Sequence, residues 1–490
     1  MGGSEPKAVA LSREQEVKKL LNWATEDMGI KAPRVKGGYV NGLRGVLATG
    51  DLGPNDEIVT VPSDSALITT TDQRCPFPDW VSPEFWNTGP WNVRLGLLLL
   101  EEKRRGQDSR FFPWIESLPR SFGTPLEWSA ADLSELQYPH LEAEVDSQRR
   151  EWTGLFESLK ASSPGCEVTQ EELNWAMGVA YSRTFSGPYE GRGPKDRLLE
   201  LAFVTALALG TVALGLGGPQ EVATGALTVL IGIPMRDFLI TKMSDLKRHA
   251  LTPVVDLINH KSGIESDVSF NYFYGYFAAT TKKPWKVGEQ IFISYGARTN
   301  DHLLQRYGFV ETDNPDDVYC ITGFLDKLES LMGESNAELL RVAGKAFGPK
   351  KVDSVTLGRN GLAGEDEEKR VMPLLRLAAV RDDQLAEDKT GAISLEDFVD
   401  QVSPANELAA RRALLQLCLS ERERLPTTLA HDEDVMSSFG QAYGGNKRLA
   451  LAFRVEKKRV LDAAISAMME TVEADTIDGA AINSAATVTA

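Results

Sequence analysis

Cysteine is scarce in this chain, and its four copies stand far apart at Cys75, Cys166, Cys320 and Cys418. They form no Cys-x-x-Cys pair, and none lies near a histidine at the spacing of a zinc site. The pattern argues against a structural zinc cluster, and we predict no metal site. A chain of 490 residues can bury a large apolar core, so it needs no disulfide framework. We therefore expect reduced thiols and an intracellular location.

Positive charge is also in deficit, because the net charge is −17. Binding to a phosphate backbone requires clustered Lys and Arg, so we predict no nucleic-acid partner. An acidic surface is compatible with a basic protein substrate, since it raises the rate of encounter with cations. The chain lacks a GxGxxG stretch that follows a strand and opens a helix, and it lacks GxxxxGK[ST]. The common dinucleotide and P-loop folds are therefore not expected.

Targeting signals are not visible in the first residues, MGGSEPKAVA. This stretch has neither the basic start and apolar core of a secretion signal nor the Arg and Ser of a transit peptide. Pro6 stands where a myristoylation motif has Ser or Thr. The residues themselves favour no particular compartment within the cell.

Apolar spacing changes along the chain and predicts an α+β fold. A helix is expected from Ser12 to Met28, with Ser12 as its N-cap, within an N-terminal extension of residues 1–30. Short β-rich runs separated by glycines and turns follow from Val35 to Pro62. Helical spacing then dominates two stretches, a helical insert at about 90–185 and a helical C-terminal domain at 318–472. The small, polar tail at 475–490 is expected to be disordered.

An apolar insertion occupies about 187–250. Its segments Leu201–Gly218 and Val222–Pro234 contain no charged residue and are rich in Gly, Ala and Thr. Two interpretations compete: a buried or partner-covered helical hairpin, and a membrane-associated hairpin. The second segment is too short to span a bilayer, and both are rich in small residues instead of Leu and Phe. Both features favour the first interpretation. Contact with a membrane or a partner protein through 201–234 stays open.

Polar residues end apolar runs in the stretch from Leu251 to Phe309. LTPVVDLINHK carries Asp256 and ends in Asn259-His260-Lys261, and QIFIS delivers Tyr295 at a Gly turn. A helix-like run then ends in RYGF, which contains Tyr307 and Phe309. Buried polar groups cost free energy unless they are paired, so such positions suit a pocket in which a few polar groups orient a ligand.

These motifs in this order resemble a SET domain. DLINHK, GEQIFISYG and RYGF are similar to its paired C-terminal motifs, and GLRGVLATGDL (Gly42 to Leu52) is similar to its N-terminal motif. The spacing is that of the class with a helical insert in the SET domain, the Rubisco large-subunit lysine methyltransferase and its relatives. The resemblance covers roughly Lys31 to Val472. It implies a SET domain at 31–310 followed by a helical substrate-binding domain at 318–472.

The resemblance also implies roles for individual residues. S-adenosylmethionine would be held by Gly42, Leu43, Arg44, Asp256, Asn259, His260, Tyr307 and Phe309. Tyr295 would be the catalytic tyrosine, and Ser182, Arg183 and Phe185 would lie near the target side chain. The implied partner is a protein substrate that presents a lysine. Family context suggests a plastid, with the cytoplasm as the alternative.

Each of these residues also has a structural interpretation. Tyr295 alone is typical of a core tyrosine at a strand end, and His260 alone of a structural histidine; their joint order favours the site. For Tyr274 and Tyr276 we prefer ordinary sheet aromatics. One departure stands out: the family commonly has Ser where this chain has Lys261, which leaves only a backbone role there.

Three functions remain open. The first is a protein-lysine N-methyltransferase acting on a non-histone protein. The second is a protein-histidine N-methyltransferase like the actin-directed relative, which has Asn where this chain has Phe185. Phe185 favours lysine, since a polar group there suits an imidazole. The third is a catalytically silent SET-like scaffold, which the intact Asn259, His260 and Tyr295 argue against.

Overall fold

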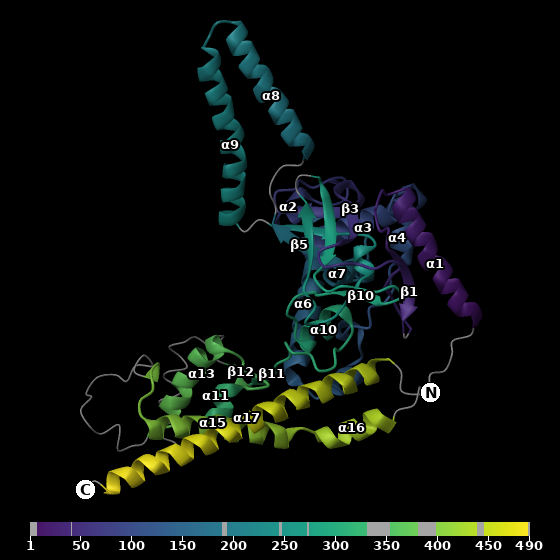
Figure 1. Cartoon of the computed structure of the whole chain (residues 1–490). Helices are drawn as coiled ribbons and strands as arrows, with labels where there is room; N and C mark the ends of the chain where they lie inside the picture. The colour runs from purple at the N-terminus through teal and green to yellow at the C-terminus, as the bar shows by residue number, and fades with distance from the viewer. Residues whose placement is uncertain are drawn as a thin grey trace. The chain divides into compact units, whose positions relative to one another are not determined.

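The computed structural model describes residues 7–40, 42–188, 194–244, 247–271, 274–330, 353–380, 398–438 and 445–488. They form two compact units, each built from two stretches of chain. The first contains Met1–Phe122 and Arg150–Ala297, and the second contains Gly123–Arg149 and Arg298–Ala490. Figure 1 shows helices and strands throughout, and the predicted α+β class is confirmed. The units do not follow the predicted domain limits, because the second also takes in residues 123–149 and 298–310.

Small sheets form the framework of the first unit. One sheet has the strand order β1-β2-β10-β7, another β3-β9-β8 and a third β4-β6-β5. The strands are β1 (Val35–Val40), β2 (Leu43–Ala48), β3 (Glu57–Pro62), β4 (Leu67–Thr70), β5 (Thr184–Pro188), β6 (Lys247–Leu251), β7 (Asn259–His260), β8 (Ser266–Asn271), β9 (Tyr276–Thr281) and β10 (Gln290–Ile293). The predicted glycine-rich hairpin is the antiparallel pair β1–β2.

The first unit also contains helices. They are α1 (Lys7–Glu26), α2 (Pro83–Thr88), α3 (Trp91–Arg105), α4 (Phe112–Ser117), α7 (Gln170–Arg183), α8 (Pro194–Ala213) and α9 (Pro219–Ser244), with the 3-10 turns η1 (Ser63–Ser65), η2 (Gly106–Asp108) and η4 (Val255–Leu257). Helix α6 (Pro139–Ser162) has residues in both units. Helices α3 and α7 approach closely because Gly96 has no side chain: a Cβ there would lie 3.4 Å from the Ala176 Cβ.

Helix α7 begins with a capping box. Thr169 Oγ1 accepts from the Glu172 N–H at 3.2 Å, and the Glu172 carboxylate accepts from the Thr169 N–H at 3.1 Å. The helix ends at Arg183, and Thr184–Pro188 then pairs with β6. The helix near the N-terminus differs from the prediction: it begins at Lys7, directly after Pro6, so Ser12 lies inside it and is not its N-cap.

The apolar insertion is a pair of antiparallel helices, α8 and α9 (Figure 1). Its chain leaves through β5 and returns through β6, which pair antiparallel from Thr184↔Leu251 to Pro188↔Lys247. The predicted helical hairpin is therefore confirmed, but burial within the chain is wrong, because most of its described side chains are exposed. Among the described residues, no helix combines enough length and apolar character to cross a membrane.

The second unit is mainly helical. Its helices are α5 (Ala130–Ser134), α10 (Asn300–Tyr307), α11 (Phe324–Ser330), α13 (Glu365–Ala378), α15 (Pro404–Arg424), α16 (Leu429–Ser438) and α17 (Asn446–Val488), with the 3-10 turn η3 (Pro125–Glu127). It also contains a sheet that sequence patterning missed: β11 (Tyr319–Thr322), β12 (Ser354–Gly358) and β13 (Gly361–Leu362). Helix α17 continues to Val488, so the predicted disordered tail is helical over most of its length. Residues 475–488 contain no proline, which would interrupt the helix.

A buried lysine joins helix α17 to the start of α10 and to β11. Lys457 Nζ donates to the Asp301 and Asp317 carboxylates, at 2.7 Å from Asp317 Oδ1, and to the Val318 carbonyl oxygen at 2.7 Å. Burial alone would lower the pKa of Lys457, but the two aspartates outweigh it and hold that pKa above its usual value. The stabilisation is therefore present below the unfolded lysine pKa of about 10.4 and is lost as pH rises through the folded pKa.

We expect Lys457→Met to lower the free energy of unfolding by about 3–5 kcal/mol, because it leaves two carboxylates without their cation. Urea unfolding followed by circular dichroism measures this. Lys369→Met is the matched control: Lys369 pairs with Glu365 on an exposed helix face at 3.4 Å, and its loss should cost at most about 0.5 kcal/mol. Equal costs for the two variants would contradict the structural role of the buried cluster.

Candidate active site

Strand β10 brings together the segments that carry the sequence motifs. It pairs antiparallel with β2 on one side, through Gln290↔Leu47 and Ile291↔Val46. On the other side it pairs parallel with β7, through Phe292↔Asn259 and Ile293↔His260. The N-terminal motif, the Asn-His pair and the segment that leads to Tyr295 are thus neighbours in one sheet.

Asn259 joins the two motifs directly. Its Nδ2 donates to the Arg44 carbonyl oxygen at 2.9 Å, across a sequence separation of 215 residues. Gly45 leaves room for this contact, because a Cβ there would lie 2.6 Å from Gln290 Nε2 and 3.0 Å from Asn259 Nδ2. Close packing of the Asn259 side chain therefore explains why a glycine stands at position 45 of the N-terminal motif.

His260 holds the backbone of Tyr295. The Tyr295 N–H donates to His260 Nδ1 at 3.0 Å, and the two rings lie 5.0 Å apart between centroids. Because Nδ1 accepts this bond, the neutral ring carries its proton on Nε2, which lies 3.3 Å from Ser262 Oγ. Lys261 uses its backbone N–H, which donates to the Ile293 carbonyl oxygen at 3.1 Å. The backbone role expected of Lys261 agrees with this bond, and the hydroxyl beside His260 comes from the next residue, Ser262, which sequence reasoning missed.

The Tyr295 hydroxyl is also fixed in place. It donates to the Ile258 carbonyl oxygen at 2.9 Å, so it lies beside the backbone that leads into Asn259-His260. A phenol that donates one bond in this way can still accept another, as an oxygen that orients an amine must. The side chain is half-buried, which leaves part of it open to solvent.

Asp256 and Arg183 form a buried ion pair. Arg183 Nη1 donates to Asp256 Oδ2 at 3.0 Å and to the Asp256 carbonyl oxygen at 2.9 Å. Trp114 Nε1 donates to the same Oδ2 at 3.1 Å. The sequence analysis did not predict this contact. No signal in the sequence could reveal it, because the indole lies 142 residues from its partner.

A strained residue sets the position of Asp256. Val254 has φ 74° and ψ −45°, a conformation that β-branched residues rarely adopt. It is fully buried, and it immediately precedes the 3-10 turn η4 that carries Asp256. Packing around Val254 holds this backbone in place, and the chain then turns so that the Asp256 carboxylate meets Arg183.

Arg44 lies close to the same charges. Its Nη1 donates to the Ser117 carbonyl oxygen at 3.0 Å. Burial, followed by repulsion from Arg183, lowers the pKa of the Arg44 guanidinium below its usual value, and Asp256 partly offsets this. The three side chains Arg44, Arg183 and Asp256 together carry a net positive charge.

Several predicted site residues occupy other environments. The Ser182 hydroxyl donates to the Gly178 carbonyl oxygen within its own helix at 2.8 Å. Phe185 is half-buried on β5 opposite Ala250. Gly42 has φ 81° in the β1–β2 turn, which favours glycine, and the next residue, Leu43, is exposed.

The aromatic predictions divide between the units. Tyr307 and Phe309 belong to the second unit, where their ring centroids lie 6.2 Å apart. Their predicted contact with the cofactor stays a prediction. Tyr276 donates its hydroxyl to Glu57 Oε1 at 2.8 Å on an exposed part of the sheet, and Tyr274 is largely exposed. These contacts agree with their interpretation as sheet aromatics.

The buried ion pair offers groups that fit S-adenosylmethionine. Asp256 Oδ1 and Arg183 Nε are both buried and have no hydrogen-bond partner in the structure. A carboxylate oxygen suits an ammonium group, and a guanidinium N–H suits a carboxylate. The amino-acid part of the cofactor carries both. Among the described residues, no group of His, Cys, Asp and Glu is arranged to hold a metal ion.

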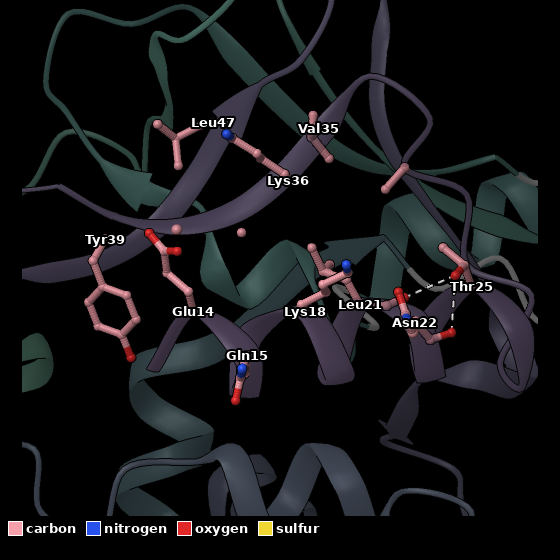
Figure 2. A pocket seen from close by; sticks show the side chains of 13 residues that line it. Glu14, Gln15, Lys18, Leu21, Asn22, Thr25, Val35, Lys36, Tyr39 and Leu47 are labelled. Atoms are coloured by element: carbon pink, nitrogen blue, oxygen red, sulfur yellow. Dashed lines mark hydrogen bonds between the residues drawn. The ribbon is translucent and has the colours of Figure 1, made fainter. Parts of the chain in front are cut away.

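A separate cavity of about 660 Å³ lies between α1 and the hairpin β1–β2 (Figure 2). Its lining includes Glu14, Lys18, Lys36 and Tyr39, and it contains none of the predicted site residues. Gly37 explains how closely α1 approaches β1, because a Cβ there would meet Val17 Cγ1 at 2.0 Å. The cavity is thus a feature of helix packing, distinct from the cluster around Asn259.

Comparison with known proteins places this geometry in a family context. Residues 333–461 match the family model described as Rubisco LSMT substrate-binding. SET domain-containing protein 4 of Homo sapiens is 25% identical over 64% of this chain, and the match spans 62% of that protein, less than two thirds of its length. The chloroplastic Rubisco large subunit N-methyltransferase of Nicotiana tabacum is 21% identical over 91% of this chain and 80% of its own length. The actin-histidine N-methyltransferase of Callithrix jacchus is 20% identical over 92% of this chain and 68% of its own length.

The solved structure of Rubisco LSMT bound to AdoMet has the same fold. It matches with a TM-score of 0.62 at 19% identity, over 94% of this chain and 93% of its own length. The predicted resemblance to the Rubisco large-subunit methyltransferase class of SET-domain proteins is therefore confirmed. Its relatives and structural neighbours include S-adenosylmethionine-dependent protein-lysine methyltransferases.

We expect Trp114 to be coupled energetically to the Arg183–Asp256 pair. Trp114→Phe removes one donor to Asp256, so in a double-mutant cycle with Asp256→Asn the two losses in unfolding free energy should deviate from additivity by about 0.5–3 kcal/mol. Urea unfolding of the four proteins measures this. Trp175→Phe is the control, because Trp175 Nε1 donates to the Pro119 carbonyl oxygen at 2.9 Å. It should be additive with Asp256→Asn within about 0.5 kcal/mol. Additivity for Trp114 as well would refute the coupling.

Proposed function

We propose that this protein is an S-adenosylmethionine-dependent protein-lysine N-methyltransferase that acts on a non-histone protein. One observation carries the proposal: three segments remote in sequence meet around β10, where Asn259 bonds the Arg44 backbone and His260 bonds the Tyr295 backbone. A silent scaffold would not need these side chains. The cofactor and the enzyme class also agree with the relatives and the solved structure described above.

The cofactor supplies an electrophilic methyl group on a positively charged sulfur. The main tasks for the protein are then to align the amine and to exclude water. Asn259 and His260 are held in one backbone arrangement by β7–β10 pairing, which suits a rigid binding surface. Asp256 and Arg183 provide the carboxylate oxygen and the guanidinium N–H that fit the amino-acid part of the cofactor.

The target lysine must lose a proton before it can act as a nucleophile. Nearby positive charge and burial both disfavour an ammonium, so they lower the lysine pKa. The cluster of Arg44, Arg183 and Asp256 contributes one net positive charge to this environment. Tyr295 then orients the neutral amine by hydrogen bonding, with its hydroxyl fixed by the Ile258 carbonyl oxygen. For Tyr307 and Phe309, contact with the cofactor is kept as part of this proposal.

The target side chain is proposed to be lysine because of Phe185. An apolar ring at the end of the SRTF motif suits the aliphatic stem of lysine better than it suits an imidazole. Histidine is the second candidate, supported by the similarity to actin-histidine N-methyltransferase. Ser182 and Arg183 are proposed to lie near the target, where Ser182 would act through the helix end that it stabilises.

A labelled-methyl assay on host-cell lysate, followed by mass-spectrometric mapping, tests the substrate class. We expect the label on lysine of a protein other than a histone. Label on histidine would replace the proposal with the second candidate, and label confined to histones would refute the non-histone substrate. A plastid location remains a prediction: some relatives are named chloroplastic, whereas others come from animals.

We expect Tyr295→Phe to reduce methyl transfer by roughly 100-fold or more while it leaves affinity for S-adenosylmethionine within about twofold. The variant keeps the ring beside His260 and removes only the hydroxyl. Turnover of the mapped substrate and calorimetric titration of the cofactor measure the two effects separately.

Tyr276→Phe is the matched control for this experiment. It also removes one tyrosine hydroxyl, here bonded to Glu57, and should change neither turnover nor cofactor affinity. Unchanged turnover in Tyr295→Phe would refute the role assigned to Tyr295. Absence of any cofactor binding by the unaltered protein would refute both enzyme candidates.

A further inference from the structure

The hairpin of α8 and α9 presents large apolar side chains to solvent. Phe203 is 69% exposed and Leu214 is 75% exposed. Other large apolar side chains of the hairpin are also exposed: Leu201, Leu207, Leu209, Leu216, Leu227, Val229 and Ile231. Within residues 201–232, whose burial the structure describes, only a narrow seam is covered, chiefly Val204 of α8. Soluble proteins rarely leave so large a continuous apolar surface without a partner.

These side chains lie on both flanks of the hairpin. At 100° per residue, Leu201, Leu209 and Val212 fall on one side of α8, and Phe203 and Leu207 fall on the opposite side. Val204, Ala208 and Thr211 lie between the two sets and include the covered seam. A helix that is apolar all round is typical of an environment that surrounds it, not of one that covers a single face.

Three threonine hydroxyls of the hairpin bond to carbonyl oxygens of their own helices. Thr211 Oγ1 donates to the Leu207 carbonyl oxygen at 2.8 Å, and Thr228 Oγ1 donates to that of Thr224 at 2.8 Å. Thr224 Oγ1 likewise donates to the Gln220 carbonyl oxygen at 2.9 Å. Threonines bonded in this way do not need water, which makes them compatible with an apolar solvent.

The turn at the tip satisfies its own backbone as well. The Leu216 N–H donates to the Thr211 carbonyl oxygen and the Gly215 N–H donates to that of Val212, each at 3.0 Å. With φ 68° at Gly215, this is the Schellman motif, which closes the carbonyl groups at the end of α8. Unpaired backbone groups at the tip would be the costliest to place in an apolar medium. Some of these groups therefore bond to one another within the turn.

Charge is nearly absent from the hairpin but returns at its base. Between Leu201 and Pro234 the sole ionisable residue is Glu221, whose carboxylate accepts from the Gly218 N–H at 3.4 Å near the start of α9. The segment from Arg236 to Arg248 then has four cationic and two acidic residues, a net charge of +2 in a chain of −17. Anionic lipid headgroups attract basic residues that flank an apolar segment.

We propose that the α8–α9 hairpin inserts tip first into the hydrocarbon of a lipid bilayer, with its basic base at the headgroups. A second copy of the chain would cover one flank and leave the other exposed, whereas lipid covers both. The charge-free part of α8, residues 201–213, extends about 20 Å at 1.5 Å per residue. That is shorter than the hydrocarbon thickness of about 30 Å, so the hairpin enters from one side and anchors the protein there.

Vesicle flotation of the full chain tests this proposal. We expect binding to phosphatidylcholine vesicles and stronger binding when phosphatidylglycerol is added. Leu207→Asp and Leu209→Asp change opposite flanks, and each should weaken binding at least about tenfold, because a carboxylate is costly in hydrocarbon. Glu221→Gln should strengthen binding, because it removes the one charge at the tip.

The matched control is Val287→Asp, which changes an exposed apolar residue outside the hairpin and should leave vesicle binding unchanged. Circular dichroism of every variant establishes that the fold is retained. Failure of the unaltered chain to float with either vesicle type would overturn the proposal. Loss of binding in only one of the two flank variants would mean that lipid contacts one flank only, and would also overturn it. So would a dimer in sedimentation velocity without lipid that Leu207→Asp or Leu209→Asp converts to a monomer.

Discussion

The pairing of β10 on both of its edges is the interaction on which the candidate site depends. Strand β2 on one side carries the N-terminal motif, and β7 on the other carries Asn259 and His260. The chain that leaves β10 reaches Tyr295 within two residues. The backbone hydrogen bonds between these strands therefore fix where each side chain begins. The Asn259 amide and the His260 ring then add cross-links that hold the motifs in register.

A second constraint is electrostatic. Asp256 is buried and would be costly alone, but Arg183 and Trp114 both donate to it. The strained backbone at Val254 persists because this packing fixes it. Two polar atoms of the cluster still lack a partner, which is unusual for buried groups and is consistent with a site that a bound molecule completes.

The apolar insertion shows how a long extra segment can be added beside such a site. It leaves and re-enters through β5 and β6, whose antiparallel pairing is complete from Thr184 to Pro188. This pairing brings the two ends of the insertion together at the sheet. The same strand β5 carries Phe185, so the insertion begins only a few residues from a residue proposed to contact the substrate. Anchoring to a surface and selection of a target would then be features of neighbouring segments.

The sequence by itself determined the fold class, the order of the motifs and the identity of the main polar residues, because short motifs and capping patterns are local properties. The helical insert at about 90–185, where α3, α6 and α7 lie, follows from it directly. It could not reveal Trp114, Ser262 or the strain at Val254, since those depend on contacts between remote segments or on packing around one backbone turn. It also left open whether the apolar hairpin is buried or exposed. Hydropathy shows that a segment is apolar, but it does not show which groups surround it. Only the tertiary structure decided that its flanks are uncovered by the described parts of the chain, since exposure is a property of the neighbours and not of the segment.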